Sequence, residues 1–192
     1  DPVPRREALL AALEAGAAVE DFKQRHDMPN ANLRIGLEAG WVYIGHAGGG
    51  GRFVYSIVGD SANTASRVEG LNKHIGTQIL ATGAVVEGFE NVLTRYLGDF
   101  QFVNKTDAVP IYHVVALNEH ATPQQQELCE RFDAAMEKYR ARDWHDAEAR
   151  LEQLLIAFPA DGPAKFFLQR CKRYAAEPDE SIDPRLVKMD AK

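Results

Sequence analysis

The order of apolar and polar residues divides the chain into a first part of mixed helices and strands and a second part that is helical only. Between residues 5 and 26, a stretch rich in Ala, Leu and Glu, apolar side chains recur at helical spacing, at Leu9, Leu13, Ala17 and Phe22. Residues 27–30, which include Pro29, break this pattern and end the predicted helix.

Runs of alternating or continuous apolar residues follow the break. We expect strands at residues 33–37 and 41–45 on either side of Gly40, a flexible glycine turn at residues 48–51, and a strand at residues 53–58. The pattern then predicts a helix over residues 61–71, a short buried strand at 78–81, a short helix at 83–89, and an antiparallel pair at 93–103 and 109–116.

The composition changes near Thr122, after which only helical periodicity is found. Three apolar stripes follow, one of them ended by Pro159. The arrangement resembles a tetratricopeptide-like helical hairpin followed by one more helix, too few repeats for a solenoid. We therefore expect three parts: a domain over residues 1–118, a helical tail over 119–176, and an extended or disordered end over 177–192. The tail could pack on the domain, mediate dimer contacts or offer a groove to a partner, and a helical cap that buries its own apolar stripe is the simplest of its roles.

Composition and charge exclude several function classes. Apolar residues make up 45% of the chain and charged residues 26%, which is typical of a globular protein. The net charge of −6 argues against a general nucleic-acid binder. No apolar run is long enough for a membrane helix and no signal peptide is recognisable, so we expect a cytoplasmic protein, or one on the cytoplasmic face of a membrane. Cys129 and Cys171 are expected to be buried free thiols.

The residues that could carry chemistry lie where the strand at 53–58 runs into the following helix. Asp60 is placed to cap the free amides of the first helical turn. Asn63 and Arg67 are four residues apart and project from one helix face. An amide can donate and accept hydrogen bonds, and a guanidinium matches phosphate oxygens, so the pair suits a ribose-phosphate ligand. On spacing alone the signal is weak, because an Asn and an Arg on one helix face are usually just solvated surface residues.

The longer segment, residues 52–72, resembles the signature of class III adenylate and guanylate cyclases, in which a strand runs into Gly-Asp, then Asn, then Ala-Ser-Arg and an acidic residue. Residues 34–48, 76–80 and 97–99 resemble further family segments in the family's order. The resemblance covers about residues 5–117. It implies a ferredoxin-like nucleotide cyclase fold of the α+β class, here in part, with the helical extension appended.

The resemblance also implies roles for individual residues. Two such domains pair head to tail, with active sites in the seam, so a homodimer or a second cyclase domain is the expected partner. Asn63 would orient the ribose, and Arg67 would neutralise charge on the α-phosphate as the 3'-hydroxyl attacks. Ser56 takes the place that reads the purine edge, which favours ATP without excluding GTP. Lys105 is a candidate phosphate contact, although a solvated loop lysine fits as well.

The family's metal site is not found in this sequence. In the family, two aspartates hold two divalent cations, Mg²⁺ or Mn²⁺, and lie upstream of the helix with which this chain starts. We therefore expect the two cations in the intact enzyme and no metal ligand in this chain. The six histidines lack metal spacing, and the glycine run at residues 45–51 is not a Walker loop.

Two functions of different classes follow. The first is a purine nucleotide cyclase in intracellular signalling, in which this chain supplies the transition-state half of the site and is inactive by itself. The alternative is a catalytically silent cyclase-homology module for dimerisation or scaffolding. A nucleotide-sensing domain is a third reading. The activating signal, such as a membrane or sensor domain, is expected outside this chain.

Overall fold

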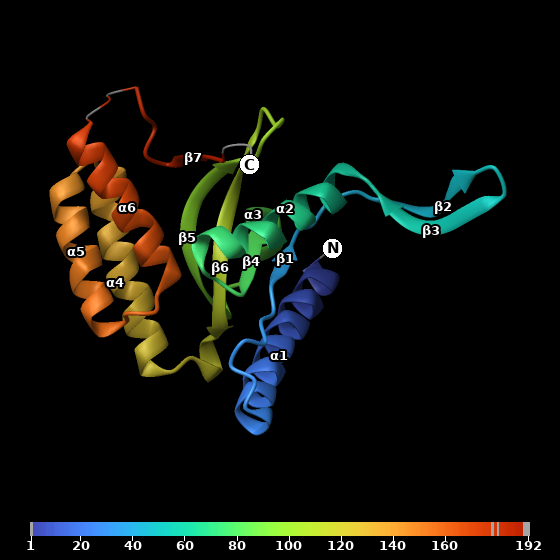
Figure 1. Cartoon of the computed structure of the whole chain (residues 1–192), viewed down its shortest axis with the longest axis horizontal. Helices are drawn as coiled ribbons and strands as arrows, with labels where there is room; N and C mark the ends of the chain where they lie inside the picture. The colour runs from blue at the N-terminus through green and yellow to red at the C-terminus, as the bar shows by residue number, and fades with distance from the viewer. Residues whose placement is uncertain (1, 178, 180, 190–192) are drawn as a thin grey trace.

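The computed structural model describes residues 2–177, 179 and 181–189. Its centre is a five-stranded sheet with the strand order β1-β4-β6-β5-β7 (Figure 1). These strands span Ile35–Leu37 (β1), Ile79–Thr82 (β4), Val92–Gln101 (β5), Ala108–Leu117 (β6) and Leu186–Lys188 (β7). β1 pairs in parallel with β4 and β7 with β5, whereas β6 runs antiparallel to both of its neighbours. The expected antiparallel pair is therefore β5 and β6.

Helices cover both faces of this sheet. Strand β4 shows how, because successive side chains of a strand point to opposite faces. Ile79 and Ala81 pack with Leu9 of α1 (Pro2–His26), whereas Leu80 packs on the other face with Val68 of α2 (Asp60–Ile75). A short helix, α3 (Gly83–Val86), follows β4. The expected α+β class is confirmed.

The helical tail shares the core of the sheet. It consists of a short 3₁₀ turn, Asn118–His120, and three helices, α4 (Pro123–Arg140), α5 (Trp144–Ala157) and α6 (Gly162–Ala176), which stand beside β5 (Figure 1). Phe132 and Phe167 of these helices belong to the same buried cluster as Leu97 and Phe100 of β5. The hydrophobic core therefore crosses residue 118, and the proposed division into parts stays a prediction. Cys129 and Cys171 are buried and free, as expected.

Several expected elements differ in length from those observed. The helix predicted at residues 61–71 runs on to Ile75, where Gly76 ends it with a left-handed φ of 78°. The helix predicted at 83–89 keeps only its first turn. No sequence pattern predicted the strand β7, which lies within residues 177–192, the segment expected to be an extended or disordered end. Within the described residues, no helix has the length and apolarity to cross a membrane.

The strands β2 (Tyr43–Gly49) and β3 (Arg52–Val58) form an antiparallel hairpin of their own, which projects from the body of the molecule (Figure 1). The first strand starts two residues later than predicted and runs through part of the glycine stretch, so the turn narrows to Gly50 and Gly51. Both have positive φ, which glycine adopts without strain. Strand β3 leads directly into α2, the helix with the candidate site residues.

Candidate functional site

Helix α2 is set closely against strand β1 by a glycine and a buried asparagine. Gly36 leaves no room for a side chain: a Cβ there would lie 2.8 Å from the Cα of Glu69. Asn72 is 1% exposed, and its Nδ2 donates to the carbonyl oxygen of Ile35 at 3.0 Å. Its Oδ1 accepts a hydrogen bond from the hydroxyl of Thr77 at 2.8 Å. These contacts fix the helix axis and thereby the side chains on its outer face.

Asn63 and Arg67 lie one turn apart on α2, as predicted. Asn63 is exposed, and its backbone N–H donates to the carbonyl of Gly59 at 3.3 Å. Arg67 is half-buried, and its Nη1 donates to the carbonyl oxygen of Val103 in the loop between β5 and β6. Arg67 also borders a shallow cavity of about 410 Å³. The guanidinium is therefore held against a fixed backbone group, whereas the asparagine amide makes no hydrogen bond within the described residues.

Lys105 comes to the same region from the β5–β6 loop. Its Nζ forms an ion pair with Asp60, the first residue of α2. The loop itself is braced by Gln101, whose Nε2 donates to the carbonyls of Lys105 and Thr106 at 3.2 and 2.9 Å. The structure thus brings Lys105 and Arg67 to neighbouring parts of one loop–helix junction.

The predicted capping role of Asp60 is wrong. The N-cap position of α2 is Gly59, and no side chain caps the helix. Asp60 is the first helical residue, and its carboxylate turns to Lys105. A carboxylate in the first turn still interacts favourably with the helix dipole. An ion pair between Asp60 and Lys105 therefore joins the start of α2 to the β5–β6 loop. The sequence pattern did not indicate this contact.

Ser56 lies apart from these residues within the chain. It is half-buried on β3 of the projecting hairpin and pairs in register with Gly45. The structure therefore brings Arg67 and Lys105 together with the start of α2, but it does not bring Ser56 into that group.

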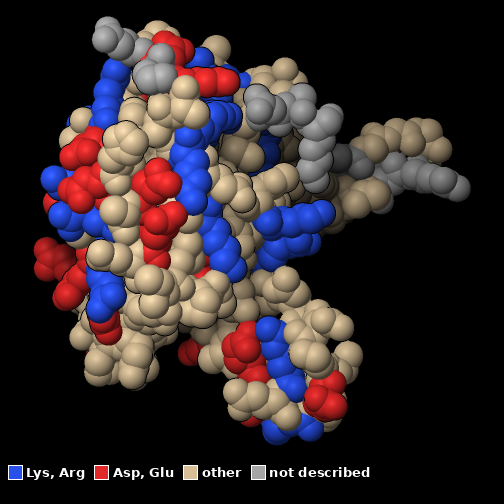
Figure 2. All heavy atoms as spheres, turned by 60° about the vertical axis from the view of Figure 1, so that its left-hand side comes forward, with Lys and Arg blue, Asp and Glu red and all other residues tan. Residues whose placement is uncertain are grey.

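The hairpin exposes large apolar side chains on both faces. Trp41 and Tyr43 are 95% and 82% exposed. Ile57 and Val58, which point to opposite faces of β3, are 57% and 56% exposed. Figure 2 shows the described part of the hairpin without a charged side chain, whereas acidic and basic residues are intermixed on the visible face of the body. An exposed apolar surface of this kind is typical of an interaction site.

Sequence reasoning missed a buried ionic cluster between the sheet and the tail. Arg95 of β5 is 1% exposed, and its Nη2 lies 2.8 Å from Oδ2 of Asp161 and 2.9 Å from Nδ1 of His113. Its guanidinium also lies over the ring of Phe132, 4.9 Å from the centroid. The side chain of Arg95 points to the buried face of β5. No local pattern in the sequence indicates that it contacts Asp161, which lies 66 residues further along the chain.

The family of adenylate and guanylate cyclase catalytic domains matches residues 6–121. Adenylate cyclase 1 of Rhizobium meliloti is 35% identical over 109 residues, covering 56% of this chain and 16% of that protein. The adenylate cyclase of Anabaena cylindrica is 32% identical over 120 residues, covering 57% of this chain and 24% of that protein. The chain thus spans at most about a quarter of the length of these relatives.

A solved structure of a bacterial light-regulated adenylyl cyclase is also similar, at 25% identity and a TM-score of 0.34, covering 38% of this chain and 35% of that chain. The expected partial cyclase fold with a helical extension is confirmed by the family match and the observed sheet and helices. More than half of the chain lies within the matched range, and it includes Ser56, Asn63, Arg67 and Lys105. The chain therefore belongs to the adenylate and guanylate cyclase catalytic domain family.

Proposed function

We propose that this chain supplies the transition-state half of a purine nucleotide cyclase site, which converts ATP to 3',5'-cyclic AMP and pyrophosphate. The observation that carries the proposal is the pair on α2: an exposed amide, Asn63, one turn before a guanidinium, Arg67, that is held against the β5–β6 loop. Membership of the cyclase family supports the same reading.

In this reaction the ribose 3'-oxygen attacks the α-phosphorus, the bond to pyrophosphate breaks, and the hydroxyl proton leaves for solvent or a base. Negative charge gathers on the α-phosphate oxygens in the transition state. In the proposal, Arg67 would offset that charge. A guanidinium has five N–H donors, and only the one to Val103 is used within the described residues. A donor that is already oriented needs little reorganisation when the charge develops.

The other two candidates have supporting parts in the proposal. Lys105 would meet the triphosphate, for which it would exchange its present partner, Asp60, for a phosphate oxygen. Ser56 would read the purine edge, and its hydroxyl can donate or accept, so ATP is favoured and GTP is the competing substrate.

The described residues do not fit a metal centre. No three His, Cys, Asp or Glu side chains within residues 2–177, 179 and 181–189 are grouped as ligands. The two acidic residues of α2 both have protein partners: Asp60 is ion-paired with Lys105, and Glu69, two residues after Arg67, is ion-paired with Arg34. The divalent cations expected for the family would therefore take their ligands from residues other than these, and the roles above rest on this chain's side chains alone.

The partner in the proposal is a second cyclase domain, most simply a second copy of this chain. A lone two-stranded hairpin is marginally stable in water, and this one leaves apolar side chains uncovered on both faces. Packing of the hairpin against a second domain would bury these side chains and bring Ser56 to a seam between two domains.

The test is an assay of the complete protein with ATP or GTP in the presence of Mg²⁺ or Mn²⁺. Arg67→Ala is expected to lower kcat by roughly 10²–10³, the usual loss for one transition-state donor. Arg25→Ala, which changes an exposed arginine on α1, is the matched control and should keep full turnover. Equal turnover of Arg67→Ala and the unchanged protein would contradict the proposal. Residues 1–192 alone are expected to show little turnover.

A second function, a silent cyclase-homology module for dimerisation or scaffolding, is favoured by one observation. Both positively charged side chains of the site already have protein partners: Arg67 donates to the carbonyl of Val103, and Lys105 is ion-paired with Asp60. A module of this kind would dimerise through the hairpin without turnover. Detection of cyclic nucleotide from the complete protein rules this reading out, and ATP binding without product would instead indicate a nucleotide sensor.

A further inference from the structure

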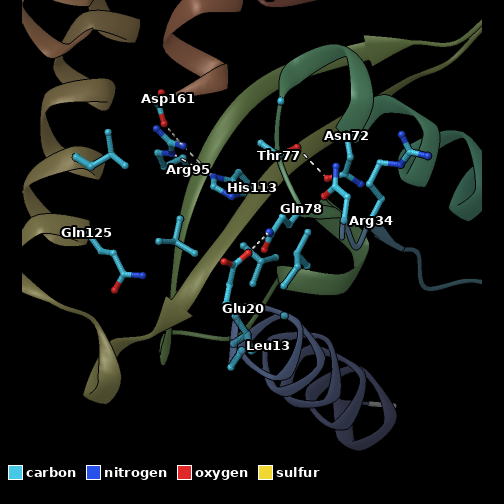
Figure 3. A pocket seen from close by; sticks show the side chains of 18 of the residues that line it. Leu13, Glu20, Arg34, Asn72, Thr77, Gln78, Arg95, His113, Gln125 and Asp161 are labelled. Atoms are coloured by element: carbon cyan, nitrogen blue, oxygen red, sulfur yellow. Dashed lines mark hydrogen bonds and ion pairs between the residues drawn. The ribbon is translucent and has the colours of Figure 1, made fainter. Parts of the chain in front are cut away.

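A cavity of about 740 Å³ lies between α1, the sheet and the first turns of α4 (Figure 3). Neither Asn63 nor Arg67 lines it, although Lys73 also borders the smaller cavity beside Arg67. Its volume is in the range of sites that bind small organic molecules. The end of α2 and the start of β4 form one side, and the cluster of Arg95, His113 and Asp161 forms another. The cavity therefore lies where the catalytic domain, its α2 helix and the helical tail meet.

The contacts of His113 fix which of its nitrogens carries hydrogen. Nδ1 lies 2.9 Å from Nη2 of Arg95 and 3.3 Å from its Nε. An arginine can only donate, so Nδ1 must accept, and the hydrogen is on Nε2. Burial and the positive charge of Arg95 lower the pKa of His113 to about 3, so the ring stays neutral near pH 7. The half-buried ring thus offers an N–H donor that has no partner within the described residues.

Two hydrogen-bond donors of this cavity, the His113 Nε2–H and the Lys73 ammonium, have no partner within the described residues, whereas its two carboxylates, Asp161 and Glu20, both accept hydrogen bonds. Asp161 accepts from Arg95 and, through its other oxygen, from the backbone N–H of Ala164 at 2.9 Å. Glu20 accepts from Lys23 and Gln78 at 2.7 and 2.9 Å. By contrast, Lys73 is an exposed lysine that borders the cavity and has no ion pair within the described part of the chain. A ligand that satisfies these groups must bring acceptor oxygens and negative charge.

The cavity also has an apolar wall, made by Leu13, Ile79, Val114 and Leu128. Ile79 and Val114 are 5% and 2% exposed, whereas Leu13 and Leu128 are half-buried, so Leu13 and Leu128 offer most of the accessible apolar surface. A wholly polar anion such as phosphate would leave it uncovered. We propose that the cavity binds a small organic carboxylate, with the carboxylate at His113 Nε2 and the Lys73 ammonium and the apolar body against Leu13 and Leu128.

The experiment is a titration of residues 1–192 with octanoate, followed by calorimetry and by backbone amide shifts. We expect saturable binding with shifts at Lys73, His113 and Val114. Octanol has the same chain without the carboxylate and should bind at least about tenfold more weakly, because it lacks the charged acceptor. Inorganic phosphate tests the headgroup chemistry alone and should bind more weakly than octanoate.

Two variants test the assigned contacts. His113→Asn retains an oxygen that can accept from Arg95 but removes the distal N–H, and Lys73→Gln removes the exposed charge without touching the core; each should weaken octanoate binding about tenfold. Lys165→Gln, at an exposed lysine of α6 outside the cavity, should leave it unchanged. The proposal is overturned if octanoate does not saturate, if octanol or phosphate binds as tightly, or if Lys73→Gln binds like the unchanged chain.

Discussion

Asp161 Oδ2 lies 2.8 Å from Arg95 Nη2, and this ion pair bonds the first residue before α6 to the middle of strand β5. The two side chains are 1% and 6% exposed, so water cannot take the place of either partner. A buried charge that loses its partner is costly, whereas exposed pairs contribute little. The pair therefore makes the docking of the tail on the sheet sensitive to a single charge.

Asp161→Asn tests that dependence. Asparagine is a good N-cap, so the hydrogen bond to the N–H of Ala164 is retained and only the charge is removed. We expect the free energy of unfolding to fall by roughly 3–5 kcal/mol in urea denaturation. Asp179→Asn, at an exposed acid, is the control and should change it by less than about 1 kcal/mol. Similar small losses for both variants would contradict the role of the pair.

Gly36→Ala is expected to displace α2. The added Cβ would lie 2.8 Å from Glu69 Cα and closer still to Glu69 N and Ala65 O, which are backbone atoms that cannot turn away. Overpacking of this kind typically destabilises by roughly 1–3 kcal/mol. Gly45→Ala is the matched control, because a Cβ added at Gly45 would have no atom of a non-neighbouring residue within 4 Å. Thermal unfolding measures the difference, and equal midpoints for the two variants would show that α2 does not need this close approach.

Ile57→Asp is expected to disrupt self-association through the hairpin. The side chain is 57% exposed in the single chain, so the change should leave the monomer folded, whereas a charge buried in an interface without a partner is strongly unfavourable. Sedimentation should show the dimer dissociating at least tenfold more readily. Ile156→Asp, at a residue of α5 that is 83% exposed, should have no such effect. A dimer that is insensitive to Ile57→Asp places the interface elsewhere.

The stability of the chain should fall in acid partly through His113. Burial and the charge of Arg95 lower the pKa of His113 from 6.5 to about 3. Below pH 6.5 the His113 ring is therefore protonated in the unfolded chain but stays neutral in the folded chain. The stabilisation is therefore complete above about pH 6.5 and is lost as the pH falls towards 3. Relative to His113→Asn, the unchanged chain should lose at most about 1.4 kcal/mol per pH unit over this window. Parallel stability curves from pH 7 to 4 would contradict it.

Local patterns predicted most of the catalytic part. The strand–turn–helix at residues 53–71 was identified because periodicity and the Gly-Asp step are local, and Asn63 and Arg67 do share a helix face. The capping role of Asp60 was wrong because its carboxylate instead meets a lysine 45 residues away. The cluster at Arg95 and the strand β7 depend on contacts between distant segments, which no single stretch of sequence encodes.

The core that joins β5 to the tail has a consequence for where the chain can be shortened. The family match ends at residue 121, yet Leu97 and Phe100, both 0% exposed, are packed with α4 and α6 beyond that point. A polypeptide that ended at residue 121 would expose these apolar side chains of β5 to water and would be prone to aggregation. The tail and the residues of the family match share one hydrophobic core, so expression trials should keep both in one polypeptide.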